Sequence, residues 1–239
     1  AFWLLVIIGG WTGFSRFYGG PFASSIPAIS GAASILLVLV AVVTGANFYS
    51  TLKGRFKLLN YSPSLKFTFF GLIMMLAYFI LAAMMQIPSW SKTLQFSLFT
   101  SGLDTFAVYG FFSMSLFGAI YFIVPRVAGA EWPSAGAIEK HFLFSVYGIA
   151  TLVLLFLVGG KAQGDNMLLL DAPFSTGFTN SVAYIVGGCI AWILIGFSNL
   201  WFFYQLLVIF LGKGRKSAGP TLMHGKTGAA SAEEAAGIA

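Results

Sequence analysis

Six apolar runs, separated by short polar stretches, constrain most strongly what this chain can fold into. Each run is long enough to cross the ~30 Å hydrocarbon layer as a helix, which rises about 1.5 Å per residue. Hydrophobic residues make up 58% of the chain and charged residues only 8%, and a charge inside a bilayer costs at least ~2.5–3.5 kcal/mol. The composition therefore predicts an all-α integral membrane protein. The expected spans are 1–18, 29–52, 64–87, 102–124, 138–160 and 179–211.

The two ends of the chain differ in character. The sequence Ala1-Phe2-Trp3-Leu4 already lies inside an apolar run, without an initial Met or the basic stretch of a signal peptide. This start indicates a longer protein or a processed N-terminus. Residues 213–239 are rich in Gly, Ala and Ser and lack apolar periodicity. They predict a flexible cytoplasmic tail after a six-helix transmembrane domain of residues 1–212.

The distribution of positive charge predicts the orientation of the helices. Arg16, Lys92 and Lys161 fall on one side of the expected bundle. By the positive-inside rule, the side with more Lys and Arg faces the cytoplasm, together with the C-terminus. The formal charge of +6 therefore reflects membrane topology and does not indicate a nucleic-acid partner. The ten of thirteen basic residues on the cytoplasmic side are Lys53, Arg55, Lys57, Lys66, Arg126, Lys140, Lys213, Arg215, Lys216 and Lys226.

Residues that bind metals or carry out catalysis are scarce in this sequence. A metal site needs several His, Cys or carboxylate side chains that converge, whereas the candidates in the membrane region are the scattered His141, Cys189 and Asp104. His224 stands alone in the expected tail, and Cys189 is interpreted as a packing residue inside an apolar run. We therefore predict no catalytic residue and no metal site.

The most specific motif lies in the fourth run. The segment Leu103–Arg126 contains Tyr109-Gly110-Phe111-Phe112 at its middle and Pro125-Arg126 at its end. It resembles the haem-carrying helix of subunit I in the haem–copper oxidase superfamily, and is most similar to the cbb3-type and nitric-oxide-reductase-like branches. His141-Phe142 and Gly159-Gly160 resemble the following helix. Six matches in the same order imply helices 7–12 of the family's twelve-helix core.

The same resemblance shows departures at the positions that carry chemistry. In the family, the haem helix opens with His-x-His, and alignment on Pro125 places this pair at Leu103 and Thr105. The family's His-His pair for copper falls at about Gly13 and Phe14. None of these four side chains is a usual ligand of haem iron or copper. The resemblance therefore implies the fold of an oxidase core without its haem and copper ligands.

Three further residues are candidates for proton, ion or structural contacts. Asp104 lies between the lost haem-ligand positions, where the helix dipole stabilises a carboxylate at a helix start; alternatively, it contacts a proton or an ion. Arg16, at the outer end of the first run, extends to lipid headgroups or meets an acidic group or a propionate. His141 is interpreted as an interfacial or helix-start residue, because the corresponding family residue is not a haem ligand.

The resemblance leads to three functional hypotheses. The first is a structural membrane subunit of a respiratory or other electron-transfer complex in the bacterial inner membrane, which offers a scaffold, a docking face and contacts to lipid or quinone. Haem and copper are then expected on partner chains, among other membrane subunits and a cytochrome c-type subunit at the outer face. The second is a redox-active half of a split oxidase, which reduces O2 or NO and pumps protons. The third is a proton- or ion-conducting protein, supported by Asp104 and Thr105.

Overall fold

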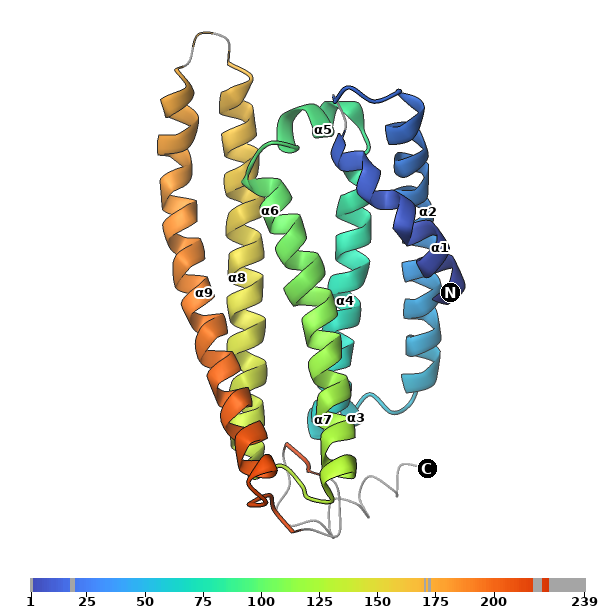
Figure 1. Ribbon diagram of the computed structural model, residues 1–239, viewed down its shortest axis with the longest axis vertical. Coiled ribbons are helices and arrows are strands. Elements are labelled where there is room, and N and C mark those ends of the chain that lie inside the picture. The colour runs from blue at the N-terminus through green and yellow to red at the C-terminus, as the bar shows by residue number, and fades with distance from the viewer. Residues whose placement is uncertain (1, 18–19, 170, 172, 217–220, 224–239) are drawn as a thin grey trace.

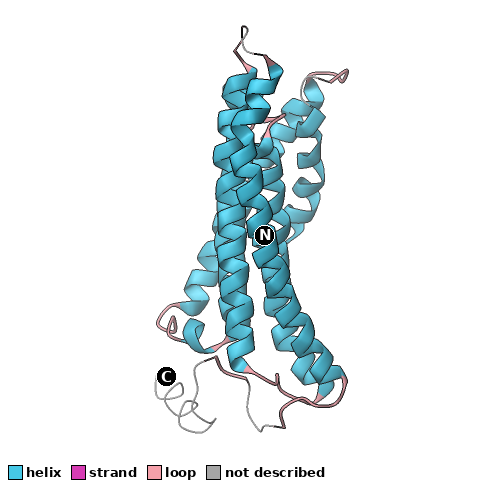
Figure 2. Cartoon of the chain, turned by 90° about the vertical axis from the view of Figure 1, so that its left-hand side faces the viewer, coloured by secondary structure: helices cyan, strands magenta, loops and turns pink. Residues whose placement is uncertain are grey.

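The long elements of the chain are all helices. The computed structural model describes residues 2–17, 20–169, 171, 173–216 and 221–223, and within them it shows helices joined by short loops (Figure 2). A single isolated β-bridge in this part of the chain joins Glu131 to Arg215. The elements are α1 (Phe2–Thr12), the 3-10 helix η1 (Gly13–Phe17), α2 (Ser25–Leu52), α3 (Leu58–Tyr61), α4 (Pro63–Met84), α5 (Pro88–Leu94), α6 (Leu98–Thr105), the π-helix η2 (Phe106–Ser113), α7 (Met114–Ala128), α8 (Ala135–Met167) and α9 (Phe174–Phe210).

Five helical segments are long and apolar enough to cross a membrane. They are Ser25–Leu52, Pro63–Met84, Leu98–Ala128, Ala135–Met167 and Ser175–Phe210. The first predicted span forms α1 and η1, an apolar segment over Phe2–Phe17 that is shorter than the other five. The prediction of an all-α integral membrane fold is confirmed, with five full-length spans and one shorter apolar helix in the order expected.

The helices stand side by side in chain order, from α2 at one edge to α9 at the other (Figure 1). Contacts join α2 to α4, α4 to α7, α6 to α8 and α8 to α9, while α1 packs obliquely on α2. The antiparallel pair α8 and α9 extends beyond the neighbouring helices at the end where α5 lies. This row places α1–η1 and α6 on opposite sides of α4. The end of η1 and the start of α6 lie at a similar level of the bundle.

The two ends of the bundle differ in charge. We call the end formed by the loops between α2 and α4, the loop between α7 and α8, and the segment after α9 the basic end. Most of the basic residues of the sequence lie there, as the alternation of the helices requires. The opposite end carries η1, α5 and the α8–α9 loop, with Arg16, Lys92 and Lys161. Which end faces the cytoplasm stays a prediction from the charge distribution.

The segment after α9 contacts the basic end wherever it is described. The main-chain N–H groups of Glu131 and Arg215 donate to each other's carbonyl oxygens at 3.0 and 2.9 Å, and Thr221 N–H donates to the Glu131 carboxylate at 2.9 Å. Met223 N–H donates to the carbonyl of Tyr61, and the Met223 side chain is buried. Packed structure therefore continues past the expected boundary at residue 213. Residues 217–220 and 224–239, with His224, lie outside the described residues, and their predicted flexibility stays a prediction.

Close packing fixes the position of α6 against α8. A Cβ atom at Gly160 would overlap the main-chain nitrogen of Phe99 at the start of α6, and one at Gly164 would overlap the carbonyl oxygen of Thr93 in α5. These two glycines therefore let α8 approach the backbone of α5 and α6. The contact holds the first turns of α6, which carry the candidate site, on a rigid neighbour.

Candidate functional site

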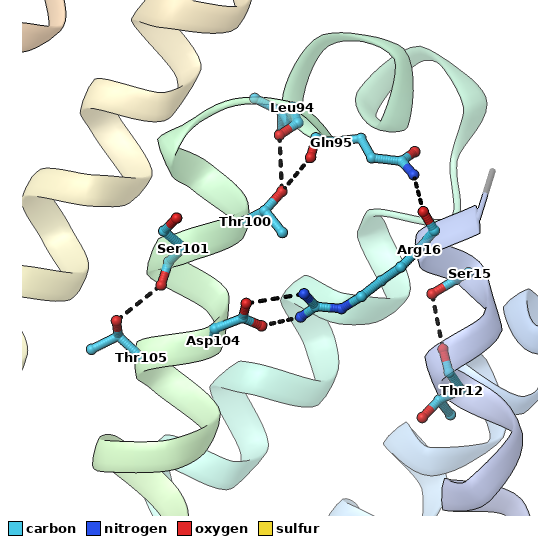
Figure 3. Close-up of polar contacts among 9 residues, drawn as sticks. All are labelled: Thr12, Ser15, Arg16, Leu94, Gln95, Thr100, Ser101, Asp104 and Thr105. Atoms are coloured by element: carbon cyan, nitrogen blue, oxygen red, sulfur yellow. Dashed lines mark hydrogen bonds and ion pairs between the residues drawn. The ribbon is translucent and has the colours of Figure 1, made fainter. Parts of the chain in front are cut away.

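An ion pair joins two elements that are far apart in the sequence. Arg16 on η1 extends across to Asp104 on α6, and its Nη1 donates to Asp104 Oδ2 at 3.0 Å while Nη2 pairs with Oδ1 (Figure 3). The side chains are 57% and 45% exposed, respectively. The two-point contact orients both groups, which a single-point ion pair would not do.

The start of α6 explains the position of Asp104. The Ser97 hydroxyl accepts a hydrogen bond from Phe99 N–H at 3.2 Å and caps the helix, which begins at Leu98. The helix therefore begins four residues before the predicted start at Gly102, and Asp104 lies in its second turn. The expected helix-start role of this carboxylate does not match the structure, since its partner is the guanidinium of Arg16 rather than the helix end.

The 3-10 helix η1 is held from both sides. Its residue Ser15 donates its main-chain N–H to the Ser30 hydroxyl of α2 at 2.7 Å, and that hydroxyl donates to the carbonyl of Thr12 at 2.8 Å. On the other side, Gln95 Nε2 donates to the carbonyl of Arg16 at 3.0 Å (Figure 3). These contacts fix the backbone of Arg16 between α2 and the α5–α6 loop.

A cavity of about 830 Å³ opens beside the ion pair, between η1, α2, α4 and α6. Its wall includes the buried apolar side chains of Leu37, Phe79 and Leu103. Arg16, Tyr78 and Gln86 add polar groups to the lining. A largely apolar cavity with a few convergent polar groups has the character of a binding site for a small molecule or a lipid.

Two of the four expected lost-ligand positions line this cavity. Leu103 is 7% exposed and forms part of the wall, and Gly13 also lines it. Thr105 is buried, and its hydroxyl donates to the carbonyl of Ser101 at 2.9 Å. Phe14 is 40% exposed on η1. Their side chains offer hydrocarbon or a hydroxyl already engaged in a hydrogen bond, so the residues at these positions do not fit ligation of haem or copper.

His141 lies away from this cavity, in the second turn of α8 towards the basic end. Its side chain is fully buried, so His141 faces the other helices rather than the surface, and its interpretation as an interfacial or helix-start residue stays a prediction. The ring packs against Phe67, Phe117 and Phe202, with centroids 5.0, 4.6 and 5.2 Å away. Its Nδ1 lies 2.7 Å from the hydroxyl of Tyr121 on α7. These contacts assign His141 to the core that joins α4, α7, α8 and α9.

The polar residues that complete the cavity and the surroundings of His141 were not identified from the sequence. Tyr78 and Gln86 lie in or just after the third apolar run, and the structure places both in the cavity wall. Tyr121 occurs in the fourth run and becomes the partner of His141. The available signal was a polar group inside an apolar helix, because such a group needs a partner or a cavity. Within the described ranges, no group of three or more His, Cys, Asp or Glu residues is placed to hold a metal ion.

Comparison with known proteins identifies the family of this chain. The chain is similar to the cbb3-type cytochrome c oxidase subunit CcoN1 of Stutzerimonas stutzeri, with 25% identity over 217 residues. The similarity covers 84% of this chain and 45% of that subunit, so the chain spans about half the length of the curated relative it matches. The family model described as cytochrome c and quinol oxidase polypeptide I matches residues 1–185, well over half of the sequence. The chain therefore belongs to the family of polypeptide I of the cytochrome c and quinol oxidases.

Proposed function

We propose that this chain is a membrane subunit of a respiratory electron-transfer complex and acts mainly as a scaffold and docking surface, with contacts to lipid or quinone. Haem and copper are then held by partner chains. One observation supports the proposal: the chain matches the oxidase polypeptide I family over residues 1–185, while Leu103 and Thr105, which the sequence resemblance aligns with the family's haem-ligating His pair, are buried side chains without a usual haem ligand. A leucine side chain has no atom that ligates iron.

The two alternative functions need chemistry that these residues do not readily supply. A redox-active half of a split oxidase needs a haem ligand from the helix that holds Leu103 and Thr105. The Thr105 hydroxyl already donates to the carbonyl of Ser101. A proton- or ion-conducting role rests on Asp104, whose two carboxylate oxygens both contact Arg16. A carboxylate held in this way is better suited to tie η1 to α6 than to pass protons.

The setting of the subunit follows from the same proposal. The relative from Stutzerimonas stutzeri is described as a subunit of a cbb3-type cytochrome c oxidase, which supports other membrane subunits as partners. The charge distribution favours the bacterial inner membrane with the C-terminus in the cytoplasm. The opposite end, with η1 and α5, then faces the outer side, where a cytochrome c-type subunit would dock.

Haem and copper counts test the proposal directly. The complex is purified through a tag on this chain, and haem and copper are quantified per copy, together with a reduced-minus-oxidised visible spectrum. We expect the counts of wild type, Leu103→Ala and Thr105→Ala to be equal and fully assigned to companion chains. Loss of one haem per complex in Thr105→Ala, with Ser101→Ala unchanged as the neighbouring control, would overturn the scaffold role.

A further inference from the structure

We propose that the cavity beside Arg16 and Asp104 binds one zwitterionic phospholipid, with the phosphate at Arg16, the ammonium group at Asp104 and an acyl chain in the apolar part. The inference deepens the proposed function, because it names the lipid that the scaffold takes up. It also rests on that function, since a haem beside Leu103 would compete for the same space.

The ion pair lies towards the end of the bundle opposite the basic end, where we expect the lipid headgroups. Asp104 is six residues after Leu98, where α6 begins, which places it about 9 Å along the helix axis. The polar layer on each side of a bilayer is roughly 5–8 Å thick. Trp90 on the adjacent α5 is of the type that marks this layer. The guanidinium and carboxylate therefore lie near the boundary between headgroups and hydrocarbon, where phosphate and ammonium groups are found.

The charges of the site match a zwitterion. Arg16 and Asp104 present one positive and one negative group side by side, and each side chain remains about half exposed. A phosphate alone at Arg16 would also meet the repulsion of Asp104, whereas a headgroup with an added ammonium would satisfy both charges. Arg16 lines the cavity and holds Asp104 beside it, whereas neither Lys161 nor Asp165, the ion pair on α8 at this end, lines the cavity. The charge pattern therefore favours an ethanolamine or choline headgroup over an anionic one.

The apolar part of the cavity is open to an acyl chain. Phe17, Phe22 and Ile35 line it and are 47%, 51% and 58% exposed, so they extend from the cavity to the surface. Leu37, Phe79 and Leu103 form its buried wall. The volume of about 830 Å³ lies within the range typical of ligand sites, ~300–1,000 Å³. The exposed apolar rim gives the chain a path from the bilayer that avoids water.

Native mass spectrometry of the delipidated full chain in detergent tests the proposal. Phosphatidylethanolamine and phosphatidylglycerol with the same acyl chains are titrated separately. We expect one phosphatidylethanolamine to bind more tightly than one phosphatidylglycerol. Arg16→Gln should weaken binding of the former about tenfold, as loss of a charge-assisted hydrogen bond would. Asp104→Asn should reverse the preference, because the site then carries a net positive charge.

Three further variants distinguish filling of the cavity from a general effect of a bulky residue and from removal of another charge. Leu103→Trp fills the cavity and should abolish the tight site for both lipids, while the lipid-facing Leu116→Trp, at a residue 47% exposed on α7, should not. Lys161→Gln removes the second ion pair and should leave binding unchanged. Circular dichroism confirms that each variant remains helical.

Several results would overturn the inference. Binding that is unchanged in Leu103→Trp, or a preference for phosphatidylethanolamine that survives in Asp104→Asn, overturns the inference. Equal binding of glycerophosphoethanolamine without acyl chains also overturns it. Haem measured in the same samples distinguishes two failures: no lipid and no haem overturns this inference alone, whereas haem held by this chain overturns the proposed function as well.

Discussion

A buried imidazole in the core illustrates, at the scale of single residues, how the bundle accommodates a polar group. His141 is enclosed by phenylalanine rings, and its Nδ1 contacts the Tyr121 hydroxyl. Its Nε2 has no hydrogen-bond partner in the described part of the chain. A buried polar group without a partner costs free energy, because water no longer solvates it. The hydrogen bond to the Tyr121 hydroxyl therefore offsets part of the free-energy cost of burying this histidine in the core.

Removing that hydroxyl should destabilise the fold. We expect Tyr121→Phe to lower the free energy of unfolding by about 1–3 kcal/mol, because the His141 ring then keeps no hydrogen bond to the described side chains. Reversible unfolding in mixed micelles, followed by circular dichroism, measures the change. Tyr147→Phe on α8, the helix of His141, removes a hydroxyl from a side chain that is 64% exposed, and should change stability by less than about 0.5 kcal/mol. Equal effects in the two variants would contradict the role of Tyr121.

The sequence marks the important residues of the cavity without pairing them. Arg16 and Asp104 each stand out as charges next to apolar runs, but they are 88 positions apart, and no local pattern joins them. Their contact depends on how η1 packs against α2 and α6, which is a property of the tertiary structure. The burial of His141 is hidden for the same reason, since its aromatic neighbours come from α4, α7 and α9.

At the scale of elements, the close approach of α8 to α5 and α6 depends on two glycines. A methyl group at Gly160 would overlap the backbone of Phe99, which cannot move without shifting the start of α6. Overpacking of this kind typically costs about 1–3 kcal/mol. We expect Gly160→Ala to be destabilising by at least that amount, and Gly164→Ala to behave similarly against Thr93.

The matched control lies on α9. A Cβ atom at Gly196 meets nothing within 4 Å, so Gly196→Ala should be neutral or slightly stabilising, because alanine favours helix by about 1 kcal/mol over glycine. Unfolding in the same micelles compares the three variants. A loss of stability in Gly196→Ala as large as in Gly160→Ala would mean that helix propensity in the membrane, rather than the α6–α8 contact, sets the response.

Helix bounds differ from the expected ones where polar residues extend a helix beyond its apolar run. α8 was expected to end at Gly160 but continues to Met167, and the i,i+4 pair of Lys161 and Asp165 supports this added length. α6 begins before the apolar run because Ser97 caps it. The π-helix η2 has no signature in the hydropathy pattern. Hydropathy locates the membrane-crossing part of a helix, whereas caps and exposed ion pairs decide its ends.

The whole molecule is a row of helices with much apolar surface. Only 22–39% of the most apolar window in each of the five spans is buried within the chain, so much apolar surface is left for the membrane to cover. The fold class was predictable because apolar length alone requires membrane helices. The order of neighbours and the cavity were not, because side chains that face lipid and those that face other helices are equally apolar.

The orientation of this row is the property of the whole molecule that remains open to a direct test. The sequence assigns ten Lys and Arg residues to one side of the membrane and three to the other, and moving many positive charges outward across the membrane is unfavourable. We expect green fluorescent protein fused after Ala239 to fluoresce, and alkaline phosphatase inserted after Asp171 in the α8–α9 loop to be active. Alkaline phosphatase needs disulfides, which form outside the cytoplasm. Exchanging the two reporters should silence both. Phosphatase activity at the C-terminus would instead show the reverse orientation. The Arg16–Asp104 cavity would then lie in the inner leaflet, and the expected docking face for a cytochrome c-type subunit would be the basic end.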